Sequence, residues 1–444
     1  MEFEGRSVLV LGLGVSGHSA ARFCASRGAR VVAADERARE SIPGLDALPA
    51  SIELRLGAPF PELGDFDLVV PSPGIPADRW AGRARRVWGD IELCYRALPI
   101  PILAVTGTNG KSTVVRLIEA MAQAAGLRAR AAGNLGVPAL ELVGQPLDIA
   151  ILEVSSFQLE SVDAFRPRTA LFLNLSPDHL DRHGDLEGYL ATKARIFARQ
   201  GAGDSAILNG DDARIRDLGL PGSVERLEFR RRHAVEAGAW LDGRNAIVRR
   251  QGRRETVRLL EGRFGGSGQD DNLLAALLAV ATLDVDLRIA TTALADFEGL
   301  PHRSESVGEI AGIRFIDDSK ATNVGAAIRA LESVEGPILW IAGGRHKGGD
   351  LSRLADCAAA RVRRAFLIGE AADEFADALE GRIPVERVGD LEKAVERAAG
   401  SAHAGESVLL APACASFDQF ENFEDRGRRF QSAVRALEAT GGMR

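Results

Sequence analysis

The sequence predicts an α/β protein of three domains, each built around a mostly parallel β-sheet. Short apolar runs alternate with longer helical patterns along most of the chain. This alternation is typical of parallel strands that are buried on both faces and connected by helices. Two of the runs end in glycine-rich loops that open a helix. The length of 444 residues, at roughly 150 residues per domain, suits about three such domains.

Composition narrows the class of protein. Apolar residues make up 46% of the chain and charged residues 26%, as in ordinary globular proteins. The net charge of −7 disfavours sequence-independent binding of nucleic acid. The four cysteines form no C-x-x-C motif, which suits a reducing compartment, and no apolar stretch is as long as a membrane span. We therefore expect a cytoplasmic protein that acts on neither nucleic acid nor membranes.

The strand pattern suggests where the domains begin and end. Residues 223–264 interrupt it, because their polar alternation and the Asp242-Gly243 turn predict antiparallel hairpins at the edge of the central sheet. A helix near 270–285 follows. We place the domains at 1–93, 94–298 and 299–444. The runs that predict buried strands are 6–12, 29–35, 67–74, 101–107, 148–155, 169–176, 314–319, 338–344, 365–370 and 408–413.

The first glycine-rich loop is Gly12-Leu13-Gly14-Val15-Ser16-Gly17, between a strand and a helix, with Asp35 at the end of the next strand. Such glycines let a pyrophosphate approach a helix N-terminus. Three interpretations stay open on spacing alone. The loop binds NAD, it binds another pyrophosphate such as that of a UDP-sugar, or it is only a tight turn.

The second loop, TGTNGKST at 106–113, also joins a strand to a helix. Backbone N–H groups in a loop of this kind cradle phosphates, a lysine neutralises them and a hydroxyl ligates Mg²⁺. Lys111 supplies the lysine here. Val105 stands where the strict motif has glycine, but GKST after an apolar strand still predicts phosphate binding.

Acidic and imidazole side chains follow the next strands of the central domain. Glu153, Asp178 and His179 lie at or after strand ends, where a parallel sheet places its ligands. Together they suit Mg²⁺ or the positioning of phosphates, although each alone is more often structural. His183, four residues after His179, imitates a helical metal pair, and we interpret it instead as a surface residue.

The C-terminal third carries four polar segments, each at the end of a predicted strand or in a loop. They are His302-Arg303, 317–323, 343–350 and 407–420. If they converge at one sheet edge, Lys347 with the hydroxyls of Thr322 and Ser416 would form a pocket for carboxylates. The alternative is glycine-rich loops with solvated charges.

Taken in this order, the motifs resemble the Mur ligase family over essentially the whole chain. The short phosphate loop TGTNGKST, DDSKATN (317–323) and the GG-x-x-K-G loop (343–348) are marks of the family. A further group of segments resembles its D-glutamate-adding branch. These segments are GLGVSG (12–17), PSPGIP (71–76), GNLG (133–136), EVSSFQLE (153–160) and, most specifically, APACASFDQF (411–420).

The resemblance implies an N-terminal Rossmann-like UDP-binding domain, a central P-loop ATPase domain and a C-terminal Rossmann-like domain for the amino acid. It implies ATP-dependent addition of D-glutamate to UDP-N-acetylmuramoyl-L-alanine through an acyl phosphate, with ATP and two Mg²⁺ ions, in a monomer. Under it, the first glycine loop binds the uridine diphosphate. L-glutamate, or a sister ligase for another amino acid or for folate, remains the alternative. A dehydrogenase would leave GKST and the acidic set without a role. Lys111, Glu153, His179 and Lys193 argue against a non-catalytic phosphate-binding regulator.

The resemblance also implies a role for each site residue. Lys111, Glu153, His179 and Lys193 would be catalytic. The metal would be held by Ser112, Thr113, Glu153, His179 and Lys193. ATP would be bound by Gly107, Thr108, Asn109, Gly110, Lys111, Ser112, Thr113, Gln269, Asn272, Arg303, Asp318 and Lys320. The UDP-substrate would contact Val15, Ser16, Asp35, Glu36, Arg37, Ser72, Pro73, Gly74, Asn134, Ser155, Gln158 and His179. Glutamate would contact Thr322, Lys347, Ser416, Phe417 and Phe423.

Two positions need separate treatment. Gln269 stands where the family usually has Asn; it keeps the same donor and acceptor on a longer arm. Lys193 is placed by the resemblance beside the second Mg²⁺, which an ammonium cannot ligate. Carbon dioxide would convert its neutral amine to a carbamate, an anionic oxygen ligand of the kind Mg²⁺ prefers. The alternative is an ordinary lysine on a helix surface.

Overall fold

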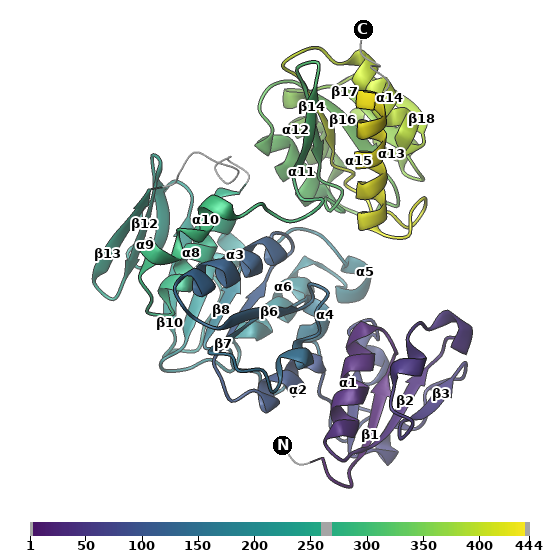
Figure 1. The fold of residues 1–444 in the computed structure, drawn as a ribbon, viewed down its shortest axis with the longest axis vertical. Coiled ribbons are helices and arrows are strands. Elements are labelled where there is room, and N and C mark those ends of the chain that lie inside the picture. Colours follow the sequence, from purple (N-terminus) through teal and green to yellow (C-terminus); the bar gives the residue numbers. More distant parts are fainter. Residues whose placement is uncertain (1–2, 259–268, 440–444) are drawn as a thin grey trace. The chain divides into compact units, whose positions relative to one another are not determined.

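The computed structural model describes residues 3–258 and 269–439, and these form three β-sheets covered by helices (Figure 1). They divide into two compact units. The first holds the N-terminal and central sheets, in residues 3–175, 181–258 and 271–296. The second holds the C-terminal sheet, in residues 176–180, 269–270 and 297–439. Our domain boundaries at 93 and 298 therefore stay a prediction. Among the described helices, none has the length and apolar character that a bilayer crossing needs.

The N-terminal sheet has four parallel strands in the order β3-β2-β1-β4. The predicted strands at 6–12, 29–35 and 67–74 are confirmed as β1, β2 and β4. The Val and Leu side chains of β1 and β4 are buried, as expected for parallel strands covered on both faces. Strand β3 alternates between exposed and half-buried positions at the sheet edge. The elements are β1 (Ser7–Leu11), α1 (Val15–Ser26), β2 (Arg30–Asp35), β3 (Glu53–Leu56), β4 (Leu68–Pro71) and α2 (Asp90–Ala97).

The central sheet has nine strands in the order β13-β12-β11-β10-β9-β8-β5-β7-β6. Strand β5, which leads into the phosphate loop, is buried throughout between β7 and β8. The strands are β5 (Ile102–Thr106), β6 (Ala129–Gly133), β7 (Ile149–Glu153), β8 (Thr169–Phe172), β9 (Ser205–Asn209), β10 (Glu225–Arg230), β11 (Gly238–Asp242), β12 (Asn245–Arg250) and β13 (Arg253–Arg258).

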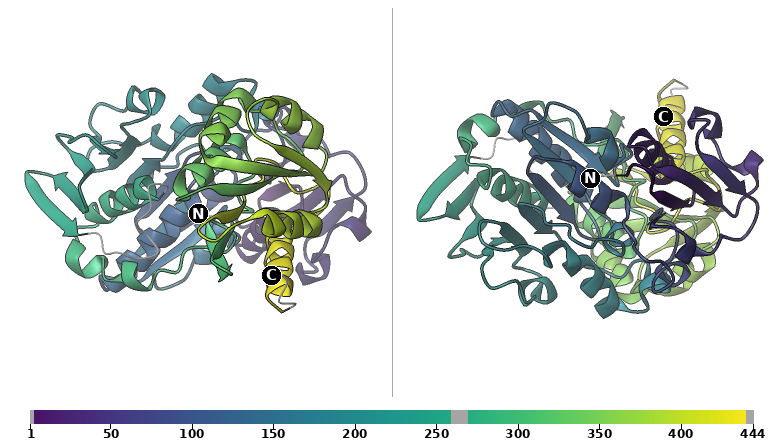
Figure 2. Two further views of the ribbon diagram at one scale, coloured as in Figure 1. Left: turned by 90° about the horizontal axis from the view of Figure 1, so that it is seen from above. Right: turned by 90° about the horizontal axis from the view of Figure 1, so that it is seen from below.

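The antiparallel excursion is shorter than predicted. Strands β11, β12 and β13 are antiparallel as expected, and Asp242-Gly243 lies at the β11–β12 turn. The prediction is wrong for β10, which pairs parallel with both β9 and β11. Leu227 and Phe229 of β10 are buried, so this strand continues the parallel core. In both views of Figure 2 the β12–β13 hairpin, in teal, lies at the outer edge of its sheet.

Helices cover the central sheet, and one of them, α3, begins directly after the phosphate loop. Helix α3 follows the glycine-rich loop and buries Val114, Leu117, Ile118 and Met121 against the sheet. The helix predicted near 270–285 is α8. The helices are α3 (Lys111–Ala124), α4 (Ser156–Leu159), α5 (Leu180–His183), α6 (Leu186–Ala194), α7 (Ala213–Arg216), α8 (Asp270–Ala281), α9 (Leu287–Ala290) and α10 (Ala293–Asp296).

The C-terminal sheet has six strands in the order β14-β15-β19-β16-β17-β18, with only β14 antiparallel. Helix α15 packs against α14 and along β14 and β15 (Figure 1). The elements are β14 (Glu305–Ile310), β15 (Ile313–Asp317), α11 (Val324–Ser333), β16 (Ile338–Gly343), α12 (Leu351–Arg361), β17 (Val362–Ile368), α13 (Ala372–Leu379), β18 (Val385–Gly389), α14 (Leu391–Ser401), β19 (Ser407–Leu410) and α15 (Phe423–Ala439).

Candidate active site

The loop between β5 and α3 has the backbone of a phosphate-binding loop. Gly107 and Gly110 have φ of 151° and 83°, conformations that L side chains rarely adopt. A Cβ at Gly110 would lie 2.3 Å from Oδ1 of Asn272 at the start of α8. The glycine thus allows the predicted nucleotide residue Asn272 to approach the loop closely.

Asn174 holds this loop in place, a role that the sequence interpretation missed. Its carbonyl accepts the Thr108 N–H at 2.9 Å. Its side chain accepts the Asn109 N–H through Oδ1 at 2.9 Å and donates to the Asn109 carbonyl at 3.0 Å. The only signal in the sequence was the position of Asn174 just after the apolar run 169–173.

Two lysine ammonium groups meet at one carbonyl of the loop. Lys111 Nζ donates to the carbonyls of Gly107 at 3.0 Å and Thr108 at 2.9 Å. Lys193 Nζ, from α6, donates to the same Gly107 carbonyl at 2.9 Å and lies 4.5 Å from the centroid of the Tyr189 ring. Lys193 is only 1% exposed, so the alternative of a helix-surface lysine is wrong. Two cations so close together favour an anion at this loop.

A carboxylate and a hydroxyl lie next to each other at the start of α3. Ser112 Oγ donates to Glu153 Oε2 at 2.5 Å, and Glu153, at the end of β7, is buried. Asn134 Nδ2 donates to the other carboxylate oxygen at 2.8 Å. Thr113 is buried on the same helical turn. Ser112 and Glu153 form a hard-oxygen donor pair of the type that binds Mg²⁺, while Asn134, predicted to contact the UDP-substrate, here orients Glu153.

His183 is not the surface residue that we predicted. Its side chain is 3% exposed and lies between the rings of Phe157 and Tyr189, with centroid distances of 5.7 and 5.1 Å. Nε2 lies 3.0 Å from Ser156 Oγ. Burial lowers the pKa of His183 below its ordinary value, which favours a neutral ring. The prediction failed because aromatic residues of α4 and α6 cover this side chain.

Asp178 and His179 lie in the compact unit that contains the C-terminal sheet. Asp178 Oδ1 accepts from Lys347 Nζ at 3.1 Å, and Oδ2 accepts from Asn323 Nδ2 at 3.0 Å. Burial of Asp178 opposes its ionisation, but the positive charge of Lys347 leads the effects that hold its pKa below the ordinary value. His179 adopts a left-handed backbone with φ of 55°, and its Nε2 is 3.8 Å from Asp178 Oδ2. The ammonium of Lys347, which we predicted to bind glutamate, is therefore already paired with the Asp178 carboxylate.

Most other residues predicted for this unit follow β15 or β19, while Arg303 precedes β14 and Phe423 begins α15. Ser304 Oγ donates to Asp318 Oδ2 at 3.0 Å, and burial raises the pKa of Asp318 to about 7. Lys320 Nζ lies 3.8 Å from the centroid of the Phe423 ring. Ser416 is buried, whereas Phe417 is 65% exposed.

The first glycine loop leads into the N-terminus of α1, a place where backbone N–H groups can bind an anion. Asp35 accepts the Leu13 N–H at 2.7 Å and two side-chain hydrogen bonds from Arg37. Burial opposes ionisation, but these bonds lower the pKa of Asp35 to about 2. Ser72 Oγ donates to the Gly12 carbonyl at 2.6 Å, and a Cβ at Gly17 would lie 1.9 Å from that oxygen. The loop's glycines are therefore required by close packing as well as by any ligand.

A cleft of about 520 Å³ opens beside this loop, and no side chain caps the first turn of α1. The backbone N–H groups of that turn can bind an anion. The cleft wall carries the exposed Val15 and the cations Arg22 and Arg37. Its lining residues are Leu13, Gly14, Val15, His18, Arg22, Arg37, Pro43, Pro138 and Glu141.

Asp90 links two of the predicted substrate residues, a role that the sequence analysis missed. Its Oδ2 accepts from Ser16 Oγ at 3.0 Å and from Gln158 Nε2 at 2.9 Å. Gln158 also forms a capping box with Ser155 at the start of α4. Burial raises the pKa of Asp90. Of the other residues predicted for the UDP-substrate, Glu36 pairs with Arg79 at 2.6 Å, and Pro73 and Gly74 follow β4.

Comparison with known proteins agrees with this geometry. The chain matches three family models: "Mur ligase MurD-like, N-terminal domain" over residues 6–84, "Mur ligase middle domain" over 105–280 and "Mur ligase, glutamate ligase domain" over 302–414. The chain belongs to the Mur ligase family. A relative from Geobacter metallireducens, named UDP-N-acetylmuramoylalanine--D-glutamate ligase, is 40% identical over 98% of this chain and 99% of its own length. A relative of the same name from Acidobacterium capsulatum is 40% identical over 98% and 97%.

Solved Mur ligases share the fold of this one. The MurF ligase of Thermotoga maritima, solved in complex with ADP, superimposes with a TM-score of 0.62 at 18% identity, covering 98% of this chain and 96% of its own. A pseudomurein peptide ligase type C from Methanothermus fervidus gives 0.63 at 17% identity, covering 98% and 100%. This Mur ligase therefore has the three-domain α/β fold that we predicted. The relatives at 40% identity, both ligases by name, contradict the dehydrogenase interpretation of the first glycine loop.

Proposed function

We propose that this Mur ligase joins D-glutamate to UDP-N-acetylmuramoyl-L-alanine at the expense of ATP, as a monomer in the cytoplasm. Full-length relatives at 40% identity are named UDP-N-acetylmuramoylalanine--D-glutamate ligase. The single structural observation that carries the proposal is the phosphate loop, where Lys111 and Lys193 meet at the Gly107 carbonyl beside the Ser112–Glu153 pair. Positive charge and oxygen ligands side by side are what a magnesium nucleotide needs.

The reaction requires a leaving group on a carboxylate, and ATP supplies it. The alanyl carboxylate attacks the γ-phosphorus of ATP, the bond to the β,γ-bridging oxygen breaks, and ADP leaves. The amine of glutamate then attacks the acyl carbon, loses a proton, and inorganic phosphate departs. Both reactants are anions, so cations that neutralise them lower the barrier. Lys111 Nζ donates to two carbonyls of the loop, and it would turn from them to the β- and γ-phosphates held by the loop N–H groups.

Magnesium fits the donor set of this chain. Ser112 and Glu153 would hold one ion, with Thr113 next to them. His179 and a carbamylated Lys193 stay predicted ligands of a second ion. When bound, Mg²⁺ neutralises charge on the phosphates. The charges around Lys193 support the carbamate. The ammonium groups of Lys193 and Lys111 donate to the same Gly107 carbonyl and repel each other. Conversion of Lys193 to an anionic carbamate would turn this repulsion into attraction.

Two further sets of residues would select the other substrates. The cleft beside α1, with Arg37 and the free helix start, would take the uridine diphosphate; Ser16, Asp35, Glu36, Ser72, Pro73, Gly74, Asn134, Ser155 and Gln158 complete that proposed set. Lys347, Thr322, Ser416, Phe417 and Phe423 would bind glutamate, with Lys347 exchanging the carboxylate of Asp178 for that of the substrate. Arg303, Asp318, Lys320, Gln269 and Asn272 stay predicted nucleotide contacts.

Phosphate release tests the proposal directly. ATP and Mg²⁺ are combined with UDP-N-acetylmuramoyl-L-alanine, and D- and L-amino acids are added one at a time. We expect phosphate release and an amide product with D-glutamate. Turnover with L-glutamate alone, or with another amino acid alone, would replace D-glutamate by that substrate. No turnover with any UDP-muramoyl acceptor would reject the proposal.

A further inference from the structure

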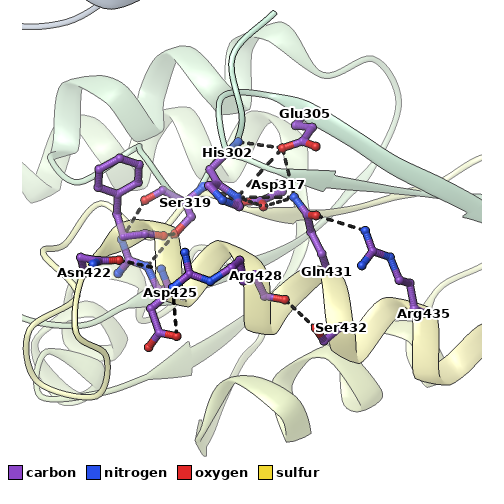
Figure 3. A network of polar contacts seen from close by, with 12 residues as sticks. His302, Glu305, Asp317, Ser319, Asn422, Asp425, Arg428, Gln431, Ser432 and Arg435 are labelled. Atoms are coloured by element: carbon purple, nitrogen blue, oxygen red, sulfur yellow. Dashed lines mark hydrogen bonds and ion pairs between the residues drawn. The ribbon is translucent and has the colours of Figure 1, made fainter. Parts of the chain in front are cut away.

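A network of polar side chains joins helix α15 to two loops of the C-terminal sheet (Figure 3). His302 Nδ1 lies 2.7 Å from Asp317 Oδ2, and both side chains are buried. Gln431 Nε2, from α15, donates to Asp317 Oδ2 and to Glu305 Oε2, each at 3.0 Å. Gly427 makes room for the network, since a Cβ there would lie 2.1 Å from His302 Nδ1.

The same three acidic and imidazole groups could in principle hold a cation. Their ligand atoms lie within 4.8 Å of one another. The Gln431 amide nitrogen, however, lies within 3.4 Å of all three, and it is a donor. The Gln431 amide donates to the carboxylate oxygens that a metal ion would otherwise bind. The geometry therefore points to a hydrogen-bonded network with a structural role, not to a metal site.

This network fixes the backbone of two loops. The His302 N–H donates to Glu305 Oε2 at 2.7 Å, and the His302 carbonyl accepts the Lys320 N–H at 3.0 Å. Asp317 Oδ1 accepts the Ser319 N–H at 2.9 Å. His302 has a positive φ of 61°, a conformation that persists only when surrounding contacts impose it. The loops held in this way carry Arg303, Asp318 and Lys320, the proposed nucleotide contacts.

A second anchor lies less than two turns earlier on α15. The Arg426 side chain is fully buried, and burial lowers its pKa to about 10, so the guanidinium remains charged at neutral pH. Its Nε donates to Ser319 Oγ at 3.0 Å, and Nη2 donates to the carbonyls of Ser319 at 2.8 Å and Cys414 at 3.1 Å. Ser319 Oγ in turn donates to the Phe423 carbonyl at 2.8 Å. Arg426 therefore ties the 317–323 loop to the segments that carry Ser416 and Phe423.

We propose that α15 is the element that positions both substrate loops of the C-terminal sheet, through two separate residues. Gln431 sets the nucleotide loops through His302 and Asp317. Arg426 joins the 317–323 loop, through Ser319, to the glutamate segments, through the Cys414 carbonyl. Both are positioning residues that act through other groups. This inference rests on the proposed function.

Gln431→Met tests the first anchor, because methionine keeps the length and volume of glutamine and removes its amide. Losing a half-buried amide donor that two carboxylates share should raise KM for ATP about fivefold or more. We expect KM for glutamate to change less than twofold and the thermal unfolding temperature to stay close to that of the parent. Ser432→Ala is the matched control, since this hydroxyl bonds only the Arg428 carbonyl among the contacts in Figure 3. It should leave all kinetic constants unchanged.

Arg426→Lys tests the second anchor while keeping the buried charge. Lysine lacks the planar fork with which arginine bonds Ser319 and the Cys414 carbonyl in this geometry, so KM should rise for glutamate and for ATP together. If this variant does not fold, the Gln431→Met result decides alone. For Gln431→Met, a parent KM for ATP or an equal rise in both KM values would overturn the inference. For Arg426→Lys, parent values of both KM constants in a folded variant would overturn it. An inactive parent enzyme would instead reject the proposed function, and direct titration of Gln431→Met with ADP would still report on the nucleotide loops.

Discussion

Replacing Asp318 by asparagine should stabilise the C-terminal unit at high pH. The pKa of this carboxyl is raised from 3.8 to about 7, chiefly because it is buried. A raised pKa means that the folded state favours the neutral acid. As pH rises from about 4 to about 7, the unfolded chain loses its proton first, and the folded state loses stability over that window. Asparagine is neutral at every pH and still offers an oxygen to Ser304.

The size of the effect follows from the shift. A difference of 3.8 to about 7 corresponds to about 4 kcal/mol at 1.36 kcal/mol per pH unit. The residue as a whole is half-buried rather than fully buried, so water screens part of the penalty, and we expect roughly 2 kcal/mol. The advantage of Asp318→Asn over the parent should therefore be about 2 kcal/mol above pH 7, shrink through pH 6 and 5, and vanish below pH 4.

Urea denaturation between pH 4 and 8 measures this difference, followed by the fluorescence of Trp340. That residue is buried in β16, and it reports on the C-terminal unit once Trp80, Trp88 and Trp240 are replaced by phenylalanine. Asp317→Asn is the control. It removes a charge that pairs with His302 at 2.7 Å, so it should destabilise the unit near neutral pH. An Asp318→Asn variant that is less stable than the parent at pH 8, or equally shifted at all pH values, would refute the reasoning.

Four further substitutions, at three lysines, test the proposed site. Lys111→Ala should abolish turnover with an unchanged circular dichroism spectrum, and activity above a tenth of the parent rate would remove Lys111 from the mechanism. Lys347→Ala should raise KM for glutamate far more than KM for ATP, whereas equal changes would place this lysine at the nucleotide. Lys193→Ala should lose most activity and regain part of it with acetate or formate, which supply oxygen ligands. Lys193→Arg should stay inactive, since near-parent activity there would show that only positive charge matters.

Much of the fold was predictable because it depends on local patterns. Buried parallel strands appear as continuous apolar runs, and β5, β7, β8 and β16 lie where those runs predicted them. The glycine loops were visible because only glycine allows the backbone and close approaches found at Gly17 and Gly110. Strand direction was less accessible: alternation in β10 indicates a strand but says nothing about its parallel pairing with β9.

Parts of the site could not be predicted because they depend on partners distant in the sequence. Asn174 contacts a loop 65 residues before it, and Asp90 accepts from residues 74 positions before and 68 positions after it. Arg426 reads as one of several charged residues near the start of α15, yet it is fully buried. His183 has two charged residues immediately before it, which suggested exposure, but the rings of Phe157 and Tyr189 enclose it.

The ion pair between Lys347 and Asp178 changes how glutamate selection should be understood. The Lys347 ammonium has a carboxylate partner at 3.1 Å, and that carboxylate also accepts from Asn323. A glutamate carboxylate that reaches Lys347 therefore replaces an existing ion pair, and the net gain is the difference between two similar interactions. Asp178 keeps Asn323 as a donor when Lys347 turns away, which lowers the cost of the exchange. We propose that discrimination among amino acids depends on the hydroxyls of Thr322 and Ser416, for which the described residues show no ion-paired carboxylate. The lysine would then supply charge neutralisation and these neutral donors would supply selectivity.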